Sequence, residues 1–384
     1  MFIPGAKALQ KTGLAKLPLH YGKAPRWLIV RMIDLAREIT TIIIDEYGRD
    51  EFLRRISDPY WFQALGCSLG YDWHSSGVTT VLTGVLKNAT KPEEHGLTVC
   101  GGKGKTSLQT PTEIGQTGNK FGLSTHRIEE LRYASRMSAK VDNAAIQAGY
   151  PLYHHAFLVA EDGKWAVVQQ GMNVRDRTAR RYHWLSDHVH NFVTEPHNAI
   201  VGDVKRNVVL DMTAKESQVC QKVSTDIVKE KPKKVLQMLQ SIRPAHQTSL
   251  QKWMPEATWK EYVAEVLSLP NNLNWEALRQ AYEFQPKNYE QLLSLRGVGP
   301  ATVRGLALIA ELVYGEKPSW KDPVKYSFAY GGKDGVPYPV DRRAMDQSIQ
   351  ILENAIKSAR IGNGEKLKSL QRLRQYVPLD YKAR

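Results

Sequence analysis

The chain has 384 residues, of which 42% are hydrophobic, a length and composition that allow two or three globular domains. Its 53 Lys and Arg residues against 39 Asp and Glu give a formal net charge of +14, which favours a polyanionic partner such as nucleic acid. The number and spacing of Cys67, Cys100 and Cys220 exclude a disulfide framework and a zinc cluster, and no apolar run could span a bilayer, so we expect a soluble, cytoplasmic protein.

The N-terminal part of the chain, residues 1–215, reads as a mixed α and β domain. Apolar residues recur at helical intervals from Arg26 to Tyr47, and Ser124 is placed to cap a long helix that reaches about residue 148. The Gly- and Lys-rich stretch 101–106 is not a nucleotide-binding phosphate loop, because Val99 occupies the position of the first glycine. It fits either a loop along a nucleic-acid backbone or an ordinary loop.

Beyond residue 150 the pattern changes to that of strands. Two alternating segments, 153–159 and 164–170, flank an Asp-Gly turn and predict a β-hairpin. Further short strands are expected near Val193 and at 207–210.

The hairpin offers a candidate metal-dependent nuclease site. Neighbouring residues of a strand point to opposite faces, so His154 and His155 face apart, as do Gln169 and Gln170. One His and one Gln can therefore share a face with a carboxylate of the preceding helix. With a lysine to steady a phosphate, such a set would hold Mg²⁺ or Mn²⁺. A structural His–Gln pair is the alternative. The remaining candidates are Asp142 or Glu130 for the carboxylate and Lys140 or Lys164 for the lysine.

Residues 175–184 are the densest mixture of guanidinium and aromatic groups in the chain. Arginine binds phosphates in bidentate fashion, and Tyr or Trp stacks on exposed bases, so one interpretation is a DNA contact. A buried tryptophan with arginines spread over the surface is the other. The candidate DNA-binding residues are Arg177, Arg180, Arg181, Tyr182 and Trp184.

From residue 216 to 384 the pattern is almost entirely helical, and we predict a second, all-helical domain within an α+β fold. Gly297-Val298-Gly299 lies between two helical segments and predicts a very tight turn with a helix on each side, at about 288–314. The glycines leave the first backbone amides of the second helix accessible, which predicts a phosphate-binding site. The alternative interpretation is an ordinary tight connection between two helices. The predicted contacts are Gly297, Val298, Gly299, Thr302 and Arg304.

This turn resembles the helix-hairpin-helix motif, and Val340-Asp341 resembles the Val-Asp that follows the motif in the helix-hairpin-helix DNA glycosylase superfamily. The resemblance implies that a base is flipped out and that Asp341 stabilises positive charge on the deoxyribose, without a cofactor. Arg342 and Arg343 would then neutralise flanking phosphates. A helix cap is the alternative role for Asp341.

The resemblance also implies how the base is removed. Family members with lyase activity carry a lysine where this chain has Ala301, so base removal without strand scission is implied, unless a lysine of the following loop substitutes. The candidate lysines are Lys321, Lys325 and Lys333.

Five segments of the chain form a distinctive set: PLHYGKAPRW (18–27), HHAF (154–157), QQGMN (169–173), ARRYHW (179–184) and AYGGKDGVPYPVDR (329–342). With them, nearly the whole chain is similar to a prokaryotic family known only as a domain of unknown function, number 763. Three functions stay open: a DNA-repair glycosylase centred on Asp341, a structure-selective nuclease of the N-terminal domain, and a non-catalytic DNA-binding protein. Duplex DNA, damaged or branched, is the expected partner in each.

Overall fold

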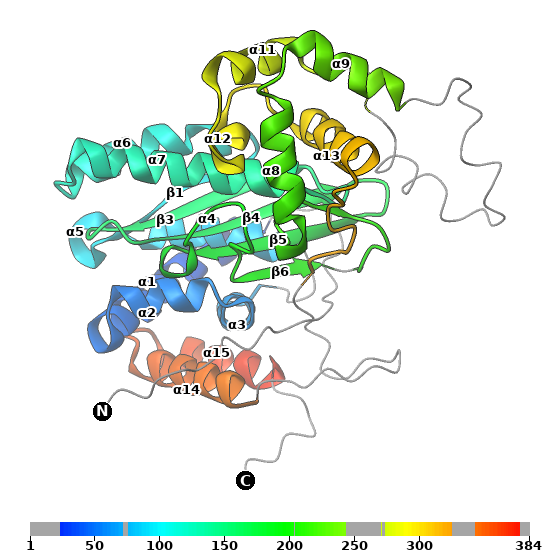
Figure 1. Cartoon of the computed structure of the whole chain (residues 1–384). Coiled ribbons are helices and arrows are strands. Elements are labelled where there is room, and N and C mark those ends of the chain that lie inside the picture. Colours follow the sequence, from blue (N-terminus) through cyan, green and yellow to red (C-terminus); the bar gives the residue numbers. More distant parts are fainter. Residues whose placement is uncertain are drawn as a thin grey trace, which may run out of the picture.

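The computed structural model describes residues 24–71, 76–202, 204–242, 270, 273–324 and 342–376. Within them the chain forms a five-stranded antiparallel sheet with helices on both faces (Figure 1). This confirms the predicted mixture of helices and strands. Asp341, Lys325 and Lys333 lie outside the described residues, and the side chains of Arg342 and Arg343 are also outside that description.

The central sheet has the strand order β1-β3-β4-β5-β6, and every neighbouring pair is antiparallel. The predicted hairpin is confirmed as β3 and β4, whose turn contains Gly163 at a φ of +84°. The strands are β1 (Leu97–Lys103), β3 (Leu152–Ala160), β4 (Trp165–Asn173), β5 (Thr178–Leu185) and β6 (Ala199–Gly202). A separate pair is formed by β2 (Ile146–Gln147) and β7 (Leu210–Asp211).

One face of the sheet packs against helices from both halves of the chain. Phe157 and Val159 of β3 point into this core, which also contains Leu131 of α7 and Leu306 of α13. The helices around this core are α6 (Thr110–Lys120), α7 (Thr125–Lys140), α8 (Gln218–Ile227), α9 (Pro232–Ser241), α11 (Trp275–Phe284), α12 (Tyr289–Ser294) and α13 (Pro300–Tyr314). Short 3-10 turns are η3 (Ser186–His188) and η4 (Lys215–Ser217).

The other face carries a second core. The next residues of β3, Ala156 and Leu158, point into it, as strand alternation requires. Its helices are α1 (Arg26–Tyr47), α2 (Arg49–Ile56), α3 (Pro59–Ser68), α4 (Gly77–Ala89), α14 (Arg342–Ser358) and α15 (Asn363–Tyr376), with α5 (Pro92–His95) leading into β1. The helical half of the chain thus contributes to both faces (Figure 1). A domain boundary near residue 215 stays a prediction.

Two local predictions differ from the structure. The long helix predicted to reach residue 148 ends at Lys140, where one π-helical turn, η2 (Val141–Ala145), replaces it. The wider turn ends in β2, because Ile146 and Gln147 pair with β7 instead of continuing a helix. Val193 belongs to no strand, and the strand expected at 207–210 is the short β7.

Candidate nucleic-acid interface

The tight turn between α12 and α13 is built by Gly297 and Val298. Gly297 has a φ of +82°, and a Cβ atom there would lie 2.8 Å from Nδ2 of Asn274, so glycine is required for both conformation and space. Val298 is 1% exposed and packs in the core beneath the two helices. The turn is therefore held close to the body of the protein.

The carbonyl groups of this turn are held from the interior. Lys140 at the end of α7 donates a hydrogen bond to the Leu295 carbonyl, and Gln147 Nε2 donates to the Pro300 carbonyl at 2.8 Å. Burial lowers the pKa of Lys140 to about 8. Because α7 and β2 fix these carbonyls, these two elements set the orientation of the turn.

The start of α13 is open. Gly299 is its N-cap residue and provides no side-chain cap, and a Cβ atom at this position would meet nothing within 4 Å. The first amides of a helix have no partner within the helix, and they carry the positive end of its dipole. An anionic oxygen can therefore approach the backbone here.

The other residues predicted around the turn are less accessible. Thr302 is 1% exposed and Val298 is buried, so neither offers a side chain to the surface. Arg304 is partly buried and donates to Gln147 Oε1 at 3.2 Å. Arg296, which directly precedes Gly297, is exposed. Phosphate contact at this turn would thus involve mainly backbone amides.

Asp142, His155 and Gln169 do share one face of the sheet, and they form a buried network. Asp142, on η2, accepts hydrogen bonds from Gln169 Nε2 and from Trp184 Nε1, the latter at 3.0 Å, and its other oxygen contacts His197 Nε2. His155 Nδ1 donates to Gln169 Oε1 at 2.7 Å, because an amide oxygen only accepts. Burial lowers the pKa of His155 against the opposing effect of the Gln169 hydrogen bond, which favours the neutral ring.

This network leaves little room for a metal ion. Both oxygens of Asp142 are engaged, and its side chain is fully buried. Of the two candidate lysines, Lys164 pairs with the exposed Asp50 and Lys140 donates to the Leu295 carbonyl, while the alternative carboxylate Glu130 pairs with Arg127. Across the described part of the chain, no group of three or more His, Cys, Asp or Glu side chains is placed to hold a metal. His197 was missed because it lies in an irregular segment without periodicity.

His154 and Gln170 lie on the opposite face and attach α4 to the sheet. His154 Nε2 is 3.0 Å from Thr83 Oγ1, and Gln170 accepts a hydrogen bond from Thr79 and donates one to the Ser76 carbonyl at 2.9 Å. Burial lowers the pKa of His154 to about 3. The separation of the two histidines onto opposite faces therefore follows the predicted strand alternation.

Four of the predicted DNA-binding residues of β5 are in the core. Arg180, Arg181, Tyr182 and Trp184 are each 0% exposed, because β5 lies inside the sheet and helices cover both of its faces. They have no surface to present to DNA, which corrects the sequence-based prediction for them. Arg177, in the β4–β5 turn, is exposed, so DNA contact by this residue stays a prediction.

Two buried arginines of β5 are paired inside the protein. Arg180 donates to Asp322 Oδ2 at 2.7 Å, and both side chains are 0% exposed. Arg181 lies 4.7 Å from the ring centroid of Phe62 and contacts Gln63. Asp322 was missed by sequence reasoning, since nothing in its surroundings distinguishes it from a surface aspartate.

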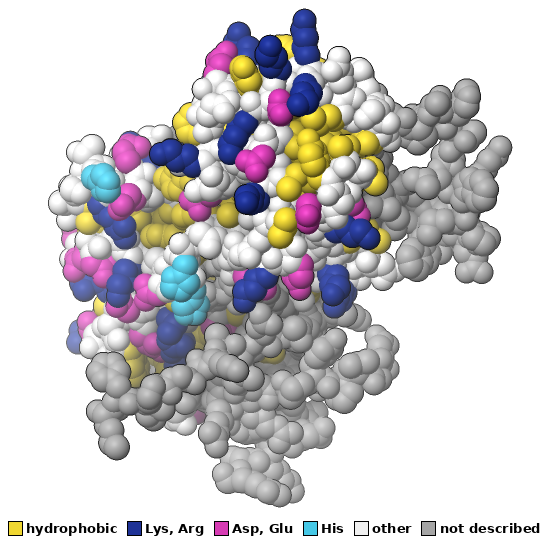
Figure 2. Space-filling view, viewed as in Figure 1, with side chains coloured by type: hydrophobic (Ala, Val, Ile, Leu, Met, Phe, Trp, Pro, Cys, Tyr) yellow, Lys and Arg dark blue, Asp and Glu magenta, His cyan; other side chains and the backbone are white. Residues whose placement is uncertain are grey.

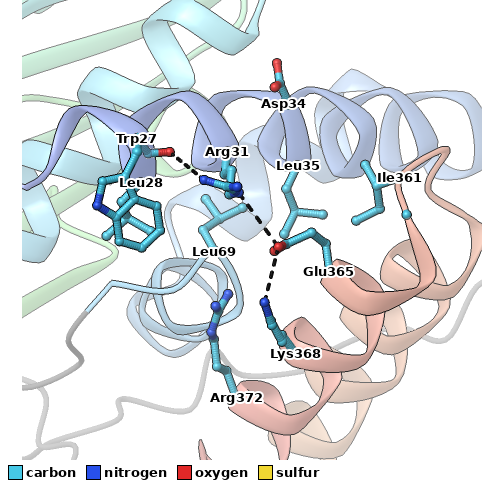
Figure 3. A pocket seen from close by; sticks show the side chains of 11 residues that line it. Trp27, Leu28, Arg31, Asp34, Leu35, Leu69, Ile361, Glu365, Lys368 and Arg372 are labelled. Carbon is cyan, nitrogen blue, oxygen red and sulfur yellow. Dashed lines mark hydrogen bonds and ion pairs between the residues drawn. The ribbon is translucent and has the colours of Figure 1, made fainter.

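A cavity of about 570 Å³ lies between α1, the end of α3, and α15 (Figure 3). Arg31 lies over the Trp27 ring at 5.4 Å, and Glu365 is 3.8 Å from Arg31 and 3.6 Å from Lys368. The cavity contains none of the predicted site residues, and its acidic and basic groups largely pair with each other. Its lining is Trp27, Leu28, Arg31, Asp34, Leu35, Leu69, Ile361, Gly362, Glu365, Lys368 and Arg372.

A hydrophobic patch is visible on the face that includes α13 (Figure 2). Leu312, Val313 and Tyr314, at the C-terminal end of that helix, are all exposed. Elsewhere on this face Lys and Arg side chains alternate with Asp and Glu, so the view shows no large basic surface.

Comparison with known proteins identifies a family without an activity. No curated protein and no solved structure matches the chain. No helix in the described ranges is long and apolar enough to cross a membrane. Residues 13–340 match the family described as "Protein of unknown function (DUF763)". The chain belongs to this family.

Proposed function

We propose that this protein binds the phosphate backbone of duplex DNA through the α12–α13 turn and acts in DNA repair. The observation that carries the proposal is the open N-terminus of α13 at Gly299, next to a turn whose carbonyls are held inward by Lys140 and Gln147. Backbone amides and a helix dipole bind one phosphate without reading the base sequence. The net charge of +14 supports a polyanionic partner.

The enzymatic part of the proposal is base removal by a glycosylase centred on Asp341. It is supported by the Val340-Asp341 pair that directly precedes α14, which begins at Arg342. A carboxylate there would stabilise the positive charge that develops on deoxyribose once the base is extruded. Ala301 replaces the lyase lysine, so strand scission is not part of the proposed reaction.

The turn is tested by Gly299→Asp. The backbone at Gly299 is extended, with φ −116° and ψ −170°, and the space around it is open, so aspartate fits and acts as an N-cap. We expect the free energy of unfolding to stay equal or rise, whereas affinity for a 20-bp duplex falls at least about tenfold, because the new carboxylate occupies the amides and repels phosphate. Fluorescence anisotropy and urea titration measure the two quantities.

Gly362→Asp is the matched control. Gly362 directly precedes α15 and also has open space around it. Its carbonyl oxygen accepts hydrogen bonds from backbone amides in the first turn of that helix. The substitution changes the net charge of the protein by the same amount. Equal losses of DNA affinity in the two variants would show that the turn has no special role.

Base removal is tested with duplexes that carry uracil, hypoxanthine or an oxidised base. We expect breaks that form in EDTA and become visible only after alkali, and their loss in Asp341→Asn, because the carboxylate would stabilise the transition state. Mg²⁺-dependent cuts without alkali would instead support the nuclease. DNA binding with neither product would identify a binding protein.

A further inference from the structure

The strand register places three loops along one end of the sheet, the end opposite the β3–β4 turn. They are the connection from β1 into the 3-10 helix η1 (Gly104–Gln109), the β4–β5 turn at 174–177, and the segment 204–206 after β6. The register explains their position, because Lys103 at the end of β1 pairs with His154 near the start of β3. We refer to these as the sheet-end loops.

Each sheet-end loop presents exposed cations. Lys103 and Lys105 belong to the first loop, Arg177 to the second and Lys205 to the third. Within the described ranges, none of these four pairs with a carboxylate; Lys103 instead lies 5.9 Å from the ring centroid of Tyr153. Their charge is therefore available to an external anion.

Each loop also exposes one large aliphatic side chain. Leu108 is 76% exposed, Val174 is 63% exposed and Val204 is 41% exposed. Each is a single aliphatic group set among cations, so it could contact an apolar part of a molecule that the cations bind. They suit a partner that is anionic and also offers apolar area, as deoxyribose does between phosphates.

Arg177 occupies its position at a conformational cost. Its φ is +53°, in the left-handed region that favours glycine or asparagine. An arginine is not needed to form this turn, and glycine would form it with less strain. The backbone of this turn therefore does not require an arginine.

The sheet-end loops are connected to the α12–α13 turn by a short stretch of chain. Gln147 holds the Pro300 carbonyl of the turn, and the nearby Tyr150 has its hydroxyl 3.1 Å from Thr178 Oγ1 and from a guanidinium nitrogen of Arg206. Arg206 also pairs with Asp176 of the β4–β5 turn. These contacts connect two of the three loops, the β4–β5 turn and the 204–206 segment, to the chain that holds the α12–α13 turn.

We propose that the sheet-end loops form a second phosphate-binding surface, over which the duplex held by the α12–α13 turn continues. The inference deepens the proposed function, since it names where the DNA path runs. The cations contact successive phosphates, and the three aliphatic side chains contact the sugars between them. In this proposal the Gly- and Lys-rich stretch at 101–106 lies along the nucleic-acid backbone, one of the two interpretations that its composition allows.

Salt dependence tests the proposal. Replacement of Lys103, Lys105 and Lys205 by Gln removes three cations, and each phosphate contact contributes about 0.9 to the slope of log affinity against log salt concentration. We therefore expect the slope for a 20-bp duplex to become shallower by about 2 to 3. The control variant replaces Lys120, Lys366 and Lys368 by Gln, which removes the same charge from other surfaces, and its slope should equal that of the wild type.

Arg177→Gly separates binding from folding. Glycine relieves the left-handed backbone, so the free energy of unfolding should not fall, whereas the salt slope should become shallower by about 1. Leu108→Ala should weaken binding without changing the slope, because an apolar contact releases no counterions. Equal slope changes in the two triple variants would overturn the proposal.

Two further outcomes are informative. Unchanged DNA slopes together with loss of sedimentation on phosphatidylserine vesicles in the Lys103, Lys105 and Lys205 variant would overturn the proposal and identify a lipid surface. If Gly299→Asp abolishes binding but these variants have wild-type slopes, this inference fails and the proposed function stands. If the slopes fall while Gly299→Asp binds normally, the role of the α12–α13 turn fails and the second surface stands.

Discussion

Replacement of Arg180 by Met is expected to lower the free energy of unfolding by about 3–5 kcal/mol, because one partner of a buried ion pair would lose its counter-charge. The two side chains are 2.7 Å apart and inaccessible to solvent. Burial lowers the pKa of Arg180, but Asp322 together with the neighbouring Tyr182 and Tyr150 outweighs burial and raises it, so the guanidinium remains ionised inside the protein. Urea titration at pH 7 measures the loss.

A double variant makes this expectation specific. Asp322 also accepts from the backbone amides of Arg206, at 2.7 Å, and Val324, at 3.1 Å. Arg180→Met combined with Asp322→Leu removes both charges and should recover part of the stability, although these two amides lose their acceptor. No recovery in the double variant would argue that packing, and not the stranded charge, causes the loss.

An exposed ion pair provides the control. Arg279 is 2.8 Å from Glu276, and both side chains are about half exposed. Arg279→Met should change the free energy of unfolding by less than about 1 kcal/mol, because solvent screens such pairs. A similar loss in both single variants would contradict the role assigned to burial.

Asp142→Asn is expected to destabilise the protein by about 2–4 kcal/mol, because three donors converge on this carboxylate and a carboxamide cannot accept from all of them. Gln169, Trp184 and His197 supply those contacts. The NH₂ group of the introduced asparagine would also place a hydrogen-bond donor against the donors that now contact Asp142. Chemical unfolding, with near-UV circular dichroism to report the Trp184 environment, measures the effect.

Asp50→Asn is the matched control, since Asp50 pairs with Lys164 at an exposed position. This substitution should lower the free energy of unfolding by less than about 1 kcal/mol. The two roles considered for Asp142 are also distinguished here. A structural role predicts that DNA binding persists below the unfolding transition, whereas selective loss of a Mg²⁺-dependent cleavage in the folded variant would support the nuclease.

The sequence allowed the β3–β4 hairpin and most of the helices after residue 216 to be predicted, because both rest on local periodicity and turn residues. It also predicted that one His and one Gln of the hairpin would share a face with Asp142 or Glu130, since strand alternation separates the two members of each pair, but it did not choose among these residues. The burial of β5 could not be predicted in this way. Arginine usually marks a surface, and only the distant Asp322 makes the internal position of Arg180 possible.

The position of the last two helices also required tertiary information. Helix α14 contributes Leu352 and Ile356 to the core formed with α1 and α3, across the sheet from α13. Their amphipathic pattern predicted helices but carried no signal for the face on which they pack. The candidate turn, by contrast, is a local feature, so its glycines could be identified from sequence alone.

This arrangement has a consequence for how the chain folds during translation. The core between α1, α3 and α4 receives Leu352, Ile356 and Leu373 from helices that are synthesised long after α1. Until the ribosome has released those helices, the apolar surface of α1, α3 and α4 lacks part of its cover. Because these contacts join segments that are far apart in the sequence, closing that core is expected to be a late and comparatively slow event in folding.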